Sequence, residues 1–89
     1  MKLIGRNKLF EIYSENGADT TVQHWICSWV SEIQHANWKS LQEVKDYYPN
    51  STYANGVFVF HINNSNKQIH LFINFLLNIA VITDIKEQL

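Results

Sequence analysis

Two apolar stretches, Val57-Phe58-Val59-Phe60-His61-Ile62 and Gln68-Ile69-His70-Leu71-Phe72-Ile73-Asn74-Phe75, flank the polar segment Asn63-Asn64-Ser65-Asn66-Lys67. The flanks are rich in β-branched and aromatic residues, and the middle carries turn-forming residues. The pattern predicts a β-hairpin. With Ser65-Asn66 at its tip, His61 lies opposite His70, and Phe60 lies opposite Leu71. This register places the larger apolar residues on one face: Phe58, Phe60, Ile62, Ile69, Leu71, Ile73 and Phe75.

The other face of the predicted hairpin is the candidate functional surface. In this register it carries polar residues among smaller apolar ones: Val57, Val59, His61, Gln68, His70, Phe72 and Asn74. Directly opposed residues of an antiparallel pair have Cβ atoms about 5 Å apart, so His61 and His70 are expected to be direct neighbours.

Helical patterns precede the hairpin. Residues 6–16 read as a helix after a short strand at Lys2–Ile4, and Gly17 is a typical stop signal. A second helix carries an apolar stripe at helical spacing: Val22, Trp25, Ile26, Trp29, Val30 and Ile33. Ser40 and Glu43 fit a capping box that opens a third, short helix before Pro49.

Strands are expected at about 56–63, 67–76 and 79–85. Helices followed by a strand meander predict an α+β domain spanning residues 1–89, with two N-terminal helices packed on one face of a small, mostly antiparallel sheet. The three tryptophans are expected in the core, Trp38 as a cap on it, and Cys27 as a half-buried thiol.

Composition narrows the class of protein. The chain has 89 residues, a net charge of −1, 46% hydrophobic and 17% charged residues, which is typical of one globular domain. Its longest apolar run is shorter than a membrane span and contains Asn74 and Asn78. We therefore expect a soluble, cytoplasmic protein without a membrane partner. His24, His35 and Cys27 do not have ligand spacing, so we assign no metal and no cofactor.

The order of short motifs resembles the HigB toxin family, within the RelE/ParE-like toxins of type II toxin-antitoxin systems. The motifs are Arg6-Asn7-Lys8-Leu9, the helix of Trp25, Trp38-Lys39, Val44-Lys45, Tyr48-Pro49, Val59-Phe60-His61-Ile62 and Asn66 to Phe75. The resemblance implies a RelE-like fold and an mRNA interferase, a metal-independent endoribonuclease that often acts on the ribosome. It also implies silencing by a cognate antitoxin, a small helix-turn-helix protein.

The chain departs from the family pattern at three places. Gln68 stands where the family usually has an arginine, His61 replaces an asparagine, and the sequence stops at Leu89 before the usual Thr-His segment. An alternative is therefore a catalytically degenerate relative that binds an antitoxin or another protein without cutting RNA. A third interpretation is a small interaction module with no link to RNA.

Metal-independent RNA cleavage needs a base, an acid and positive charge at the phosphate. Histidines supply base and acid near neutral pH, which makes His61 and His70 the candidate catalytic pair. On the residues alone, the favoured interpretation is that they are partly exposed strand residues with no catalytic role, and the resemblance narrows the difference. The candidate RNA contacts are Lys39, Lys45 and Lys67 for phosphate, with Gln68 beside the histidines and Phe72 to stack on a base.

Overall fold

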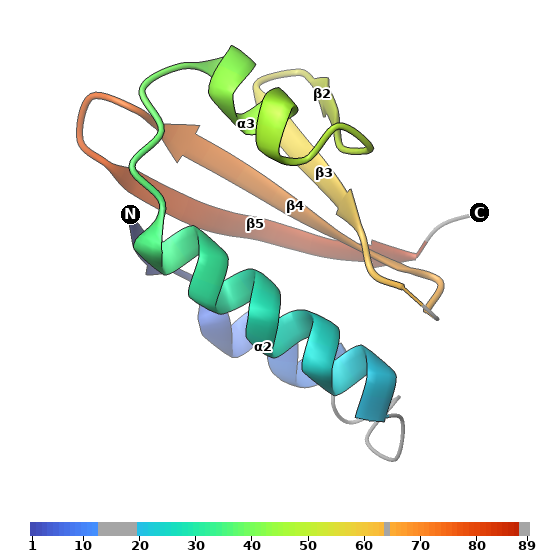
Figure 1. Ribbon diagram of the computed structural model, residues 1–89. Coiled ribbons are helices and arrows are strands. Elements are labelled where there is room, and N and C mark those ends of the chain that lie inside the picture. Colours follow the sequence, from blue (N-terminus) through green and yellow to red (C-terminus); the bar gives the residue numbers. More distant parts are fainter. Residues whose placement is uncertain (13–19, 64, 88–89) are drawn as a thin grey trace.

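A five-stranded mixed sheet, in the order β1-β5-β4-β3-β2, is the framework of the chain (Figure 1). The computed structural model describes residues 1–12, 20–63 and 65–87. The strands are β1 (Lys2–Ile4), β2 (Thr52–Ala54), β3 (Val57–His61), β4 (Lys67–Asn74) and β5 (Ile79–Glu87). The helices are η1 (Arg6–Leu9), a 3₁₀ helix, and the α-helices α2 (Thr20–His35) and α3 (Leu41–Tyr47). The expected α+β class is confirmed.

The sheet is mostly antiparallel, as expected. Only the short strand β1 runs parallel to its neighbour, β5, while the other three strand pairs of the described sheet are antiparallel. The chain leaves β1 through Gly5, which has a φ of +92°. A Cβ atom at this position would lie 2.9 Å from the carbonyl oxygen of Ile82, so both the conformation and the space favour glycine.

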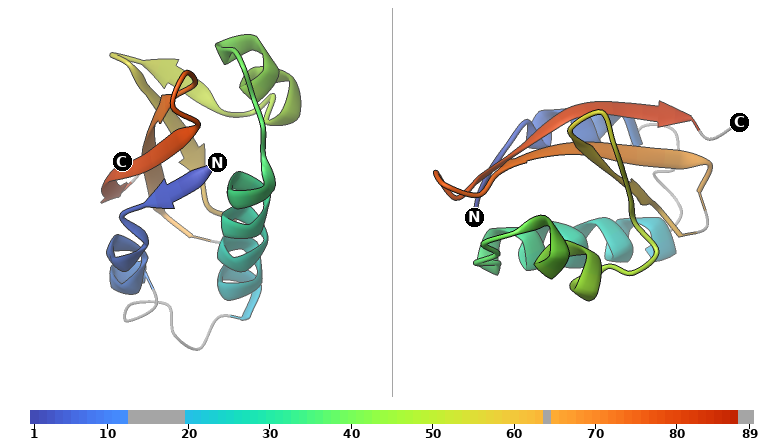
Figure 2. Two further views of the ribbon diagram at one scale, coloured as in Figure 1. Left: turned by 90° about the vertical axis from the view of Figure 1, so that its left-hand side faces the viewer. Right: turned by 90° about the horizontal axis from the view of Figure 1, so that it is seen from above.

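Helix α2 lies across one face of the sheet, as the view from above makes plain (Figure 2). The apolar stripe read from the sequence is its buried side, with Val22, Ile26 and Ile33 fully buried. The ring of Trp29 meets the ring of Phe60 on β3 edge to face, with centroids 5.5 Å apart. This contact joins helix and sheet into one core and fixes which sheet face looks inward.

The expected first helix is only partly described. Residues 6–9 form a 3₁₀ helix rather than α-helix, residues 10–12 are helical, and the remainder of the expected span lies outside the described residues. The packing of two complete N-terminal helices on one sheet face therefore stays a prediction. None of the described helices is long and apolar enough to cross a membrane.

Helix α3 begins where the capping box predicted. The side chain of Ser40 accepts a hydrogen bond from the backbone N–H of Glu43, at 3.4 Å, and the Glu43 carboxylate accepts from the backbone N–H of Lys39. These bonds satisfy backbone donors at the start of the helix. Val44 is its buried residue, and it anchors α3 on the core.

The hairpin of β3 and β4 forms, but the predicted register is wrong by two residues. Phe60 lies opposite Ile69, and His61 lies opposite Gln68 rather than His70. The closing hydrogen bond runs from the N–H of Ile62 to the carbonyl oxygen of Lys67, so the turn is centred one residue earlier than expected. A shift of two residues keeps each side chain on its face. The inward set is therefore still buried: Phe58, Phe60, Ile62, Ile69, Leu71 and Ile73.

Strand β2 was not expected from the sequence. It pairs with β3 through a two-residue turn at Asn55-Gly56, whose φ angles of 56° and 82° are typical of a tight hairpin. The strand has only three residues and all of them are exposed, so it lacks the alternation that marks a strand. Its pairing ends at Val59, so Phe60 and His61 at the end of β3 pair only with β4 within the described sheet.

Candidate functional site

The outer face, defined here as the sheet surface that faces away from α2, carries the residues predicted for catalysis. His61, Gln68, His70 and Phe72 have the outward parity in β3 and β4, and each is half-buried or exposed. The sequence therefore assigned these four residues to the correct face.

His61 is the more accessible of the two histidines. It is exposed at the end of β3 that leads into the hairpin turn. Its Nδ1 lies 3.5 Å from the side-chain Nε2 of Gln68, its cross-strand neighbour. An amide N–H can donate to an imidazole nitrogen, so Gln68 is placed to hold one ring nitrogen as acceptor and leave the other as donor.

His70 lies deeper, between β3 and β5. It is opposite Val59 on one side and Asp84 on the other, and its Nε2 is buried without a hydrogen-bond partner among the described residues. Burial, and then the positive charge of Lys86, lower its pKa from the ordinary 6.5, while Asp84 opposes the shift. A lowered pKa keeps this imidazole neutral at physiological pH, which is the state of a base.

A β-bulge adjusts the sheet at His70. The register between β4 and β5 shifts at His70 and Leu71, and Thr83 is the extra residue on β5. The Thr83 hydroxyl donates to the carbonyl oxygen of His70, at 3.3 Å. Bulges re-aim side chains, so this one sets the direction in which His70 projects.

The two histidines are diagonal neighbours rather than directly opposed residues. Diagonal positions on one face of an antiparallel pair are about 7–8 Å apart, compared with the expected 5 Å or so for an opposed pair. A base and an acid that act in line on a phosphodiester must reach oxygens on opposite sides of the phosphorus. The diagonal arrangement leaves room for that group, which a directly opposed pair would not.

Apolar groups border the histidines. Phe72 is 44% exposed and lies opposite Val81 on β5, and Ile4 of β1, opposite Val81 on its other side, is 41% exposed. A row of partly exposed apolar side chains across three strands, with Val81 between Phe72 and Ile4, is typical of a contact surface. Phe72 can therefore offer a ring face to a base or an apolar surface to a protein.

The three candidate phosphate-binding lysines do not gather around the histidines. Lys39 is exposed before α3, with its Nζ donating to the Asn37 side chain at 3.1 Å. The Nζ of Lys45 donates to the carbonyl oxygen of Ser51. Lys67 is buried at the start of β4 and forms an ion pair with Glu87, at 3.1 Å.

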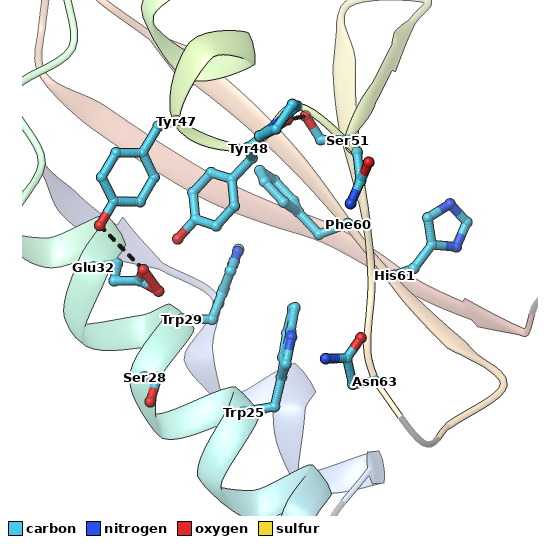
Figure 3. Close-up of a pocket in the computed structure, with 12 residues that line it drawn as sticks. Trp25, Ser28, Trp29, Glu32, Tyr47, Tyr48, Ser51, Phe60, His61 and Asn63 are labelled. Carbon is cyan, nitrogen blue, oxygen red and sulfur yellow. Dashed lines mark hydrogen bonds between the residues drawn. The ribbon is translucent and has the colours of Figure 1, made fainter.

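A concave feature, the aromatic groove, lies between α2 and the sheet (Figure 3). Its volume is about 440 Å³, and it opens between α2, the end of α3 and the end of β3. Aromatic rings form most of its wall: Trp25, Trp29, Tyr47, Tyr48 and Phe60. Trp25 stacks on Trp29 with centroids 6.3 Å apart, and Tyr48 meets Phe60 edge to face at 5.1 Å.

One carboxylate and several donors project into the aromatic groove. Tyr47 donates its hydroxyl to Glu32 at 3.2 Å, and the Glu32 charge raises the Tyr47 pKa. Burial raises the pKa of Tyr48 far above its usual range, with the nearby Glu32 charge adding to the effect. The Tyr48 hydroxyl and the Trp29 Nε1–H are both buried without a hydrogen-bond partner among the described residues. Buried donors without acceptors are costly, so this groove has unmet hydrogen-bonding capacity.

The remaining residues singled out from the sequence are the tryptophans, the cysteine and a histidine of α2. Trp29 and Trp38 are core residues, as predicted, and Trp25 is half-buried against that core. Cys27 is exposed, so the expected half-buried position is wrong: it lies on the polar side of α2. His35 bonds through Nδ1 to the carbonyl oxygen of Ser31. In residues 1–12, 20–63 and 65–87, no three metal-ligating side chains cluster.

Sequence reasoning missed the residues that β5 and the helices contribute. Asp84 and Lys86 flank His70, but their pairing depends on the bulge at Thr83, which no local pattern announces. Glu32 and Tyr47 meet in the groove although they are 15 residues apart. Glu32 reads as an ordinary solvated helix residue, and only the tertiary fold gives it an aromatic surrounding.

Comparison with known proteins gives a family match over most of the chain. Residues 22–86 match the HigB toxin family, described as the RelE-like toxic component of a toxin-antitoxin system. The matched span contains nearly all of α2 and of β5 and the whole of α3 and β2 to β4, and therefore the histidines of the outer face and the lining of the aromatic groove. No protein of curated function matches the chain.

Proposed function

This chain belongs to the HigB toxin family, and from that premise we propose that it is an endoribonuclease that cuts messenger RNA and is silenced by a cognate antitoxin. Membership makes it a toxin of a toxin-antitoxin system. The proposed cleavage of messenger RNA rests on the pair of histidines on the outer face, of which His61 is exposed and His70 has a lowered pKa. We place its action in the cytoplasm, with messenger RNA, alone or on the ribosome, as the substrate.

In the proposed reaction, His70 takes the proton of a ribose 2′-hydroxyl because it is neutral at physiological pH. His61, oriented by Gln68, gives a proton to the leaving oxygen. Lys86, opposite Gln68, supplies positive charge on this face, and Phe72 stacks on a base. Lys39, Lys45 and Lys67 hold phosphates further along the strand. No metal or cofactor takes part in this scheme.

A second candidate function is a catalytically degenerate toxin relative that binds its antitoxin without cutting RNA. It is favoured by the burial of the His70 Nε2 and by the ion pair that already occupies Lys67. Both observations lower the capacity of the outer face to receive a phosphate. The antitoxin, which we propose to be a small helix-turn-helix protein, would cover the apolar part of this face around Phe72.

Expression in a bacterium separates the two functions. Induction of the unmodified chain should arrest growth, and co-expression of the neighbouring antitoxin gene should restore it. The variant with His61→Ala and His70→Ala should be harmless, while the matched control with His24→Ala and His35→Ala, both exposed on α2, should still arrest growth. Normal growth with the unmodified, folded chain would select the binding-only function.

A further inference from the structure

The aromatic groove has a charge that does not suit RNA. Its lining includes one carboxylate, Glu32, and no lysine or arginine within the described part of the chain. None of the ion pairs formed by the described residues involves Glu32, so its charge is not compensated by a salt bridge. A phosphate-bearing strand would be repelled here, whereas a cation would be attracted.

The wall of the groove adds a second preference for a cation. Trp25 is half-buried and Tyr47 is 55% exposed, so both rings can offer their faces to a ligand. Aromatic faces attract guanidinium and ammonium groups, tryptophan most strongly. A guanidinium is planar, stacks on such rings and bonds to a carboxylate through two N–H groups, which favours arginine over lysine.

The unmet donors in the groove require an acceptor as well. Among the described residues, the Trp29 Nε1–H and the Tyr48 hydroxyl are buried without a hydrogen-bond partner, although the Tyr48 hydroxyl lies near the Glu32 carboxylate. Figure 3 shows both pointing into the space between α2 and β3. A guanidinium has no acceptor to offer them. The backbone of a peptide brings carbonyl oxygens together with the arginine side chain, so one peptide segment can satisfy the carboxylate and the donors at the same time.

We propose that the aromatic groove is a docking site for one arginine side chain of the antitoxin, with Glu32 binding its guanidinium and Trp29 and Tyr48 bonding to the adjacent peptide carbonyls. This proposal rests on the toxin role proposed above only for the identity of the partner. The groove lies mainly on the α2 side of the sheet, but His61 is one of its lining residues, so an antitoxin bound there would also lie next to one of the two proposed catalytic histidines.

The first experiment measures the groove chemistry without any antitoxin. The ¹⁵N-labelled chain is titrated with the peptide N-acetyl-Ala-Arg-Ala-amide, and the indole N–H signals of Trp25 and Trp29 are followed by NMR. The same peptide with citrulline is the control, because it keeps the shape and removes the charge. We expect saturable changes in chemical shift with the arginine peptide and at least fivefold weaker binding of the citrulline peptide. This difference is the combined contribution expected from one partly desolvated cation–π contact and one ion pair.

Variants locate the effect. Glu32→Gln should weaken binding of the arginine peptide about twofold to fivefold, in line with the loss of one ion pair. Asp46→Asn is the matched control, since Asp46 is exposed on α3 outside the groove, and it should bind as the unmodified chain does. Equal binding of both peptides, no shift at any concentration in the folded chain, or a stronger response to guanosine monophosphate would each overturn the proposal.

The second experiment uses the toxin–antitoxin complex. Each arginine of the antitoxin is replaced by methionine in turn, and the dissociation constant is measured with unmodified and Glu32→Gln toxin. Replacing one particular arginine should lower the affinity of the antitoxin for the unmodified toxin about tenfold, but should hardly change its affinity for the Glu32→Gln toxin. This pattern is expected when the two residues interact directly. Additive losses at every arginine would overturn the proposal. Neither experiment depends on RNA cleavage, so a failure of the catalytic proposal is recognised separately by the growth test.

Discussion

Phe60 and His61 are neighbours in β3, yet the two sides of the sheet place them in opposite surroundings. Phe60 is 2% exposed and touches the rings of Trp29 and Tyr48, whereas His61 is exposed and contacts the side chain of Gln68. The inner face is close-packed and has little tolerance for change. The outer face is sparsely packed, so its residues can vary with function at little cost in stability.

Truncation of one ring on each face should show the largest difference. Phe60→Ala should destabilise the domain by about 3–5 kcal/mol, because it removes a buried ring and leaves a cavity. Phe72→Ala should cost about 1 kcal/mol or less, because Phe72 already has 44% of its surface in water. Chemical denaturation followed by tryptophan fluorescence measures both. Equal losses would mean that the outer face is packed against something.

The histidines should show the reverse pattern, with a large effect on rate and a small one on stability. Replacing either His61 or His70 by alanine should lower the RNA cleavage rate by about 10²–10⁴-fold, the usual share of a positioned acid or base. The unmodified chain should show a bell-shaped dependence of rate on pH. Circular dichroism checks that the variants are folded. Full activity in the His61→Ala variant would remove this residue from the mechanism.

The lysines should give a smaller, graded effect on RNA binding. Lys39→Ala should weaken binding and reduce the salt slope by about 0.7–0.9, the value for one phosphate contact. Lys67→Ala should change the slope less, because Glu87 already neutralises part of that charge. Lys2→Ala, on β1, is a control outside the predicted contacts. Fluorescence anisotropy at several salt concentrations gives the slopes, and identical slopes for all variants would separate the lysines from RNA binding.

The smallest effect concerns stability and pH. Because burial lowers the His70 pKa below 6.5, the unfolded chain binds a proton at a higher pH than the folded chain does. The contribution of neutral His70 is therefore fully present above about pH 6.5 and is lost as the pH falls through its lowered folded pKa. As the pH falls from about 6.5 through the lowered pKa of His70, a His70→Gln variant should lose less free energy of unfolding than the unmodified chain does. Parallel curves for the two proteins would contradict the burial of His70.

Periodicity in the sequence was sufficient to identify the two faces but not their exact register. Alternation with a period of two assigned Phe60 inward and His61 outward, and it would do so equally well after any shift by two residues. The register depends instead on the hydrogen bond between Ile62 and Lys67 that closes the turn. For this reason the cross-strand partner of His61 was predicted wrongly, while its face was predicted correctly.

Features that depend on tertiary contacts were beyond the sequence pattern. The bulge at Thr83 brings Asp84 opposite His70, and strand β2 exists because Asn55-Gly56 turns the chain back along β3. The aromatic groove needs Glu32 from α2 and Tyr48 beyond α3 at one place. The stripe of α2 and the cap of α3 were predictable because both are local, with residues three or four positions apart.

The central claim is that a HigB-family toxin cuts RNA with the histidines of its outer face and without a metal ion. The most direct test is incubation of the purified chain with a messenger RNA transcript in the presence of EDTA, followed by analysis of the fragment ends. The account predicts cleavage that leaves 2′,3′-cyclic phosphate ends, because the 2′-hydroxyl is the attacking group, and no cleavage by the variant with His61→Ala and His70→Ala. Intact RNA after incubation with the folded, unmodified chain, on free transcript and on translating ribosomes alike, would contradict it.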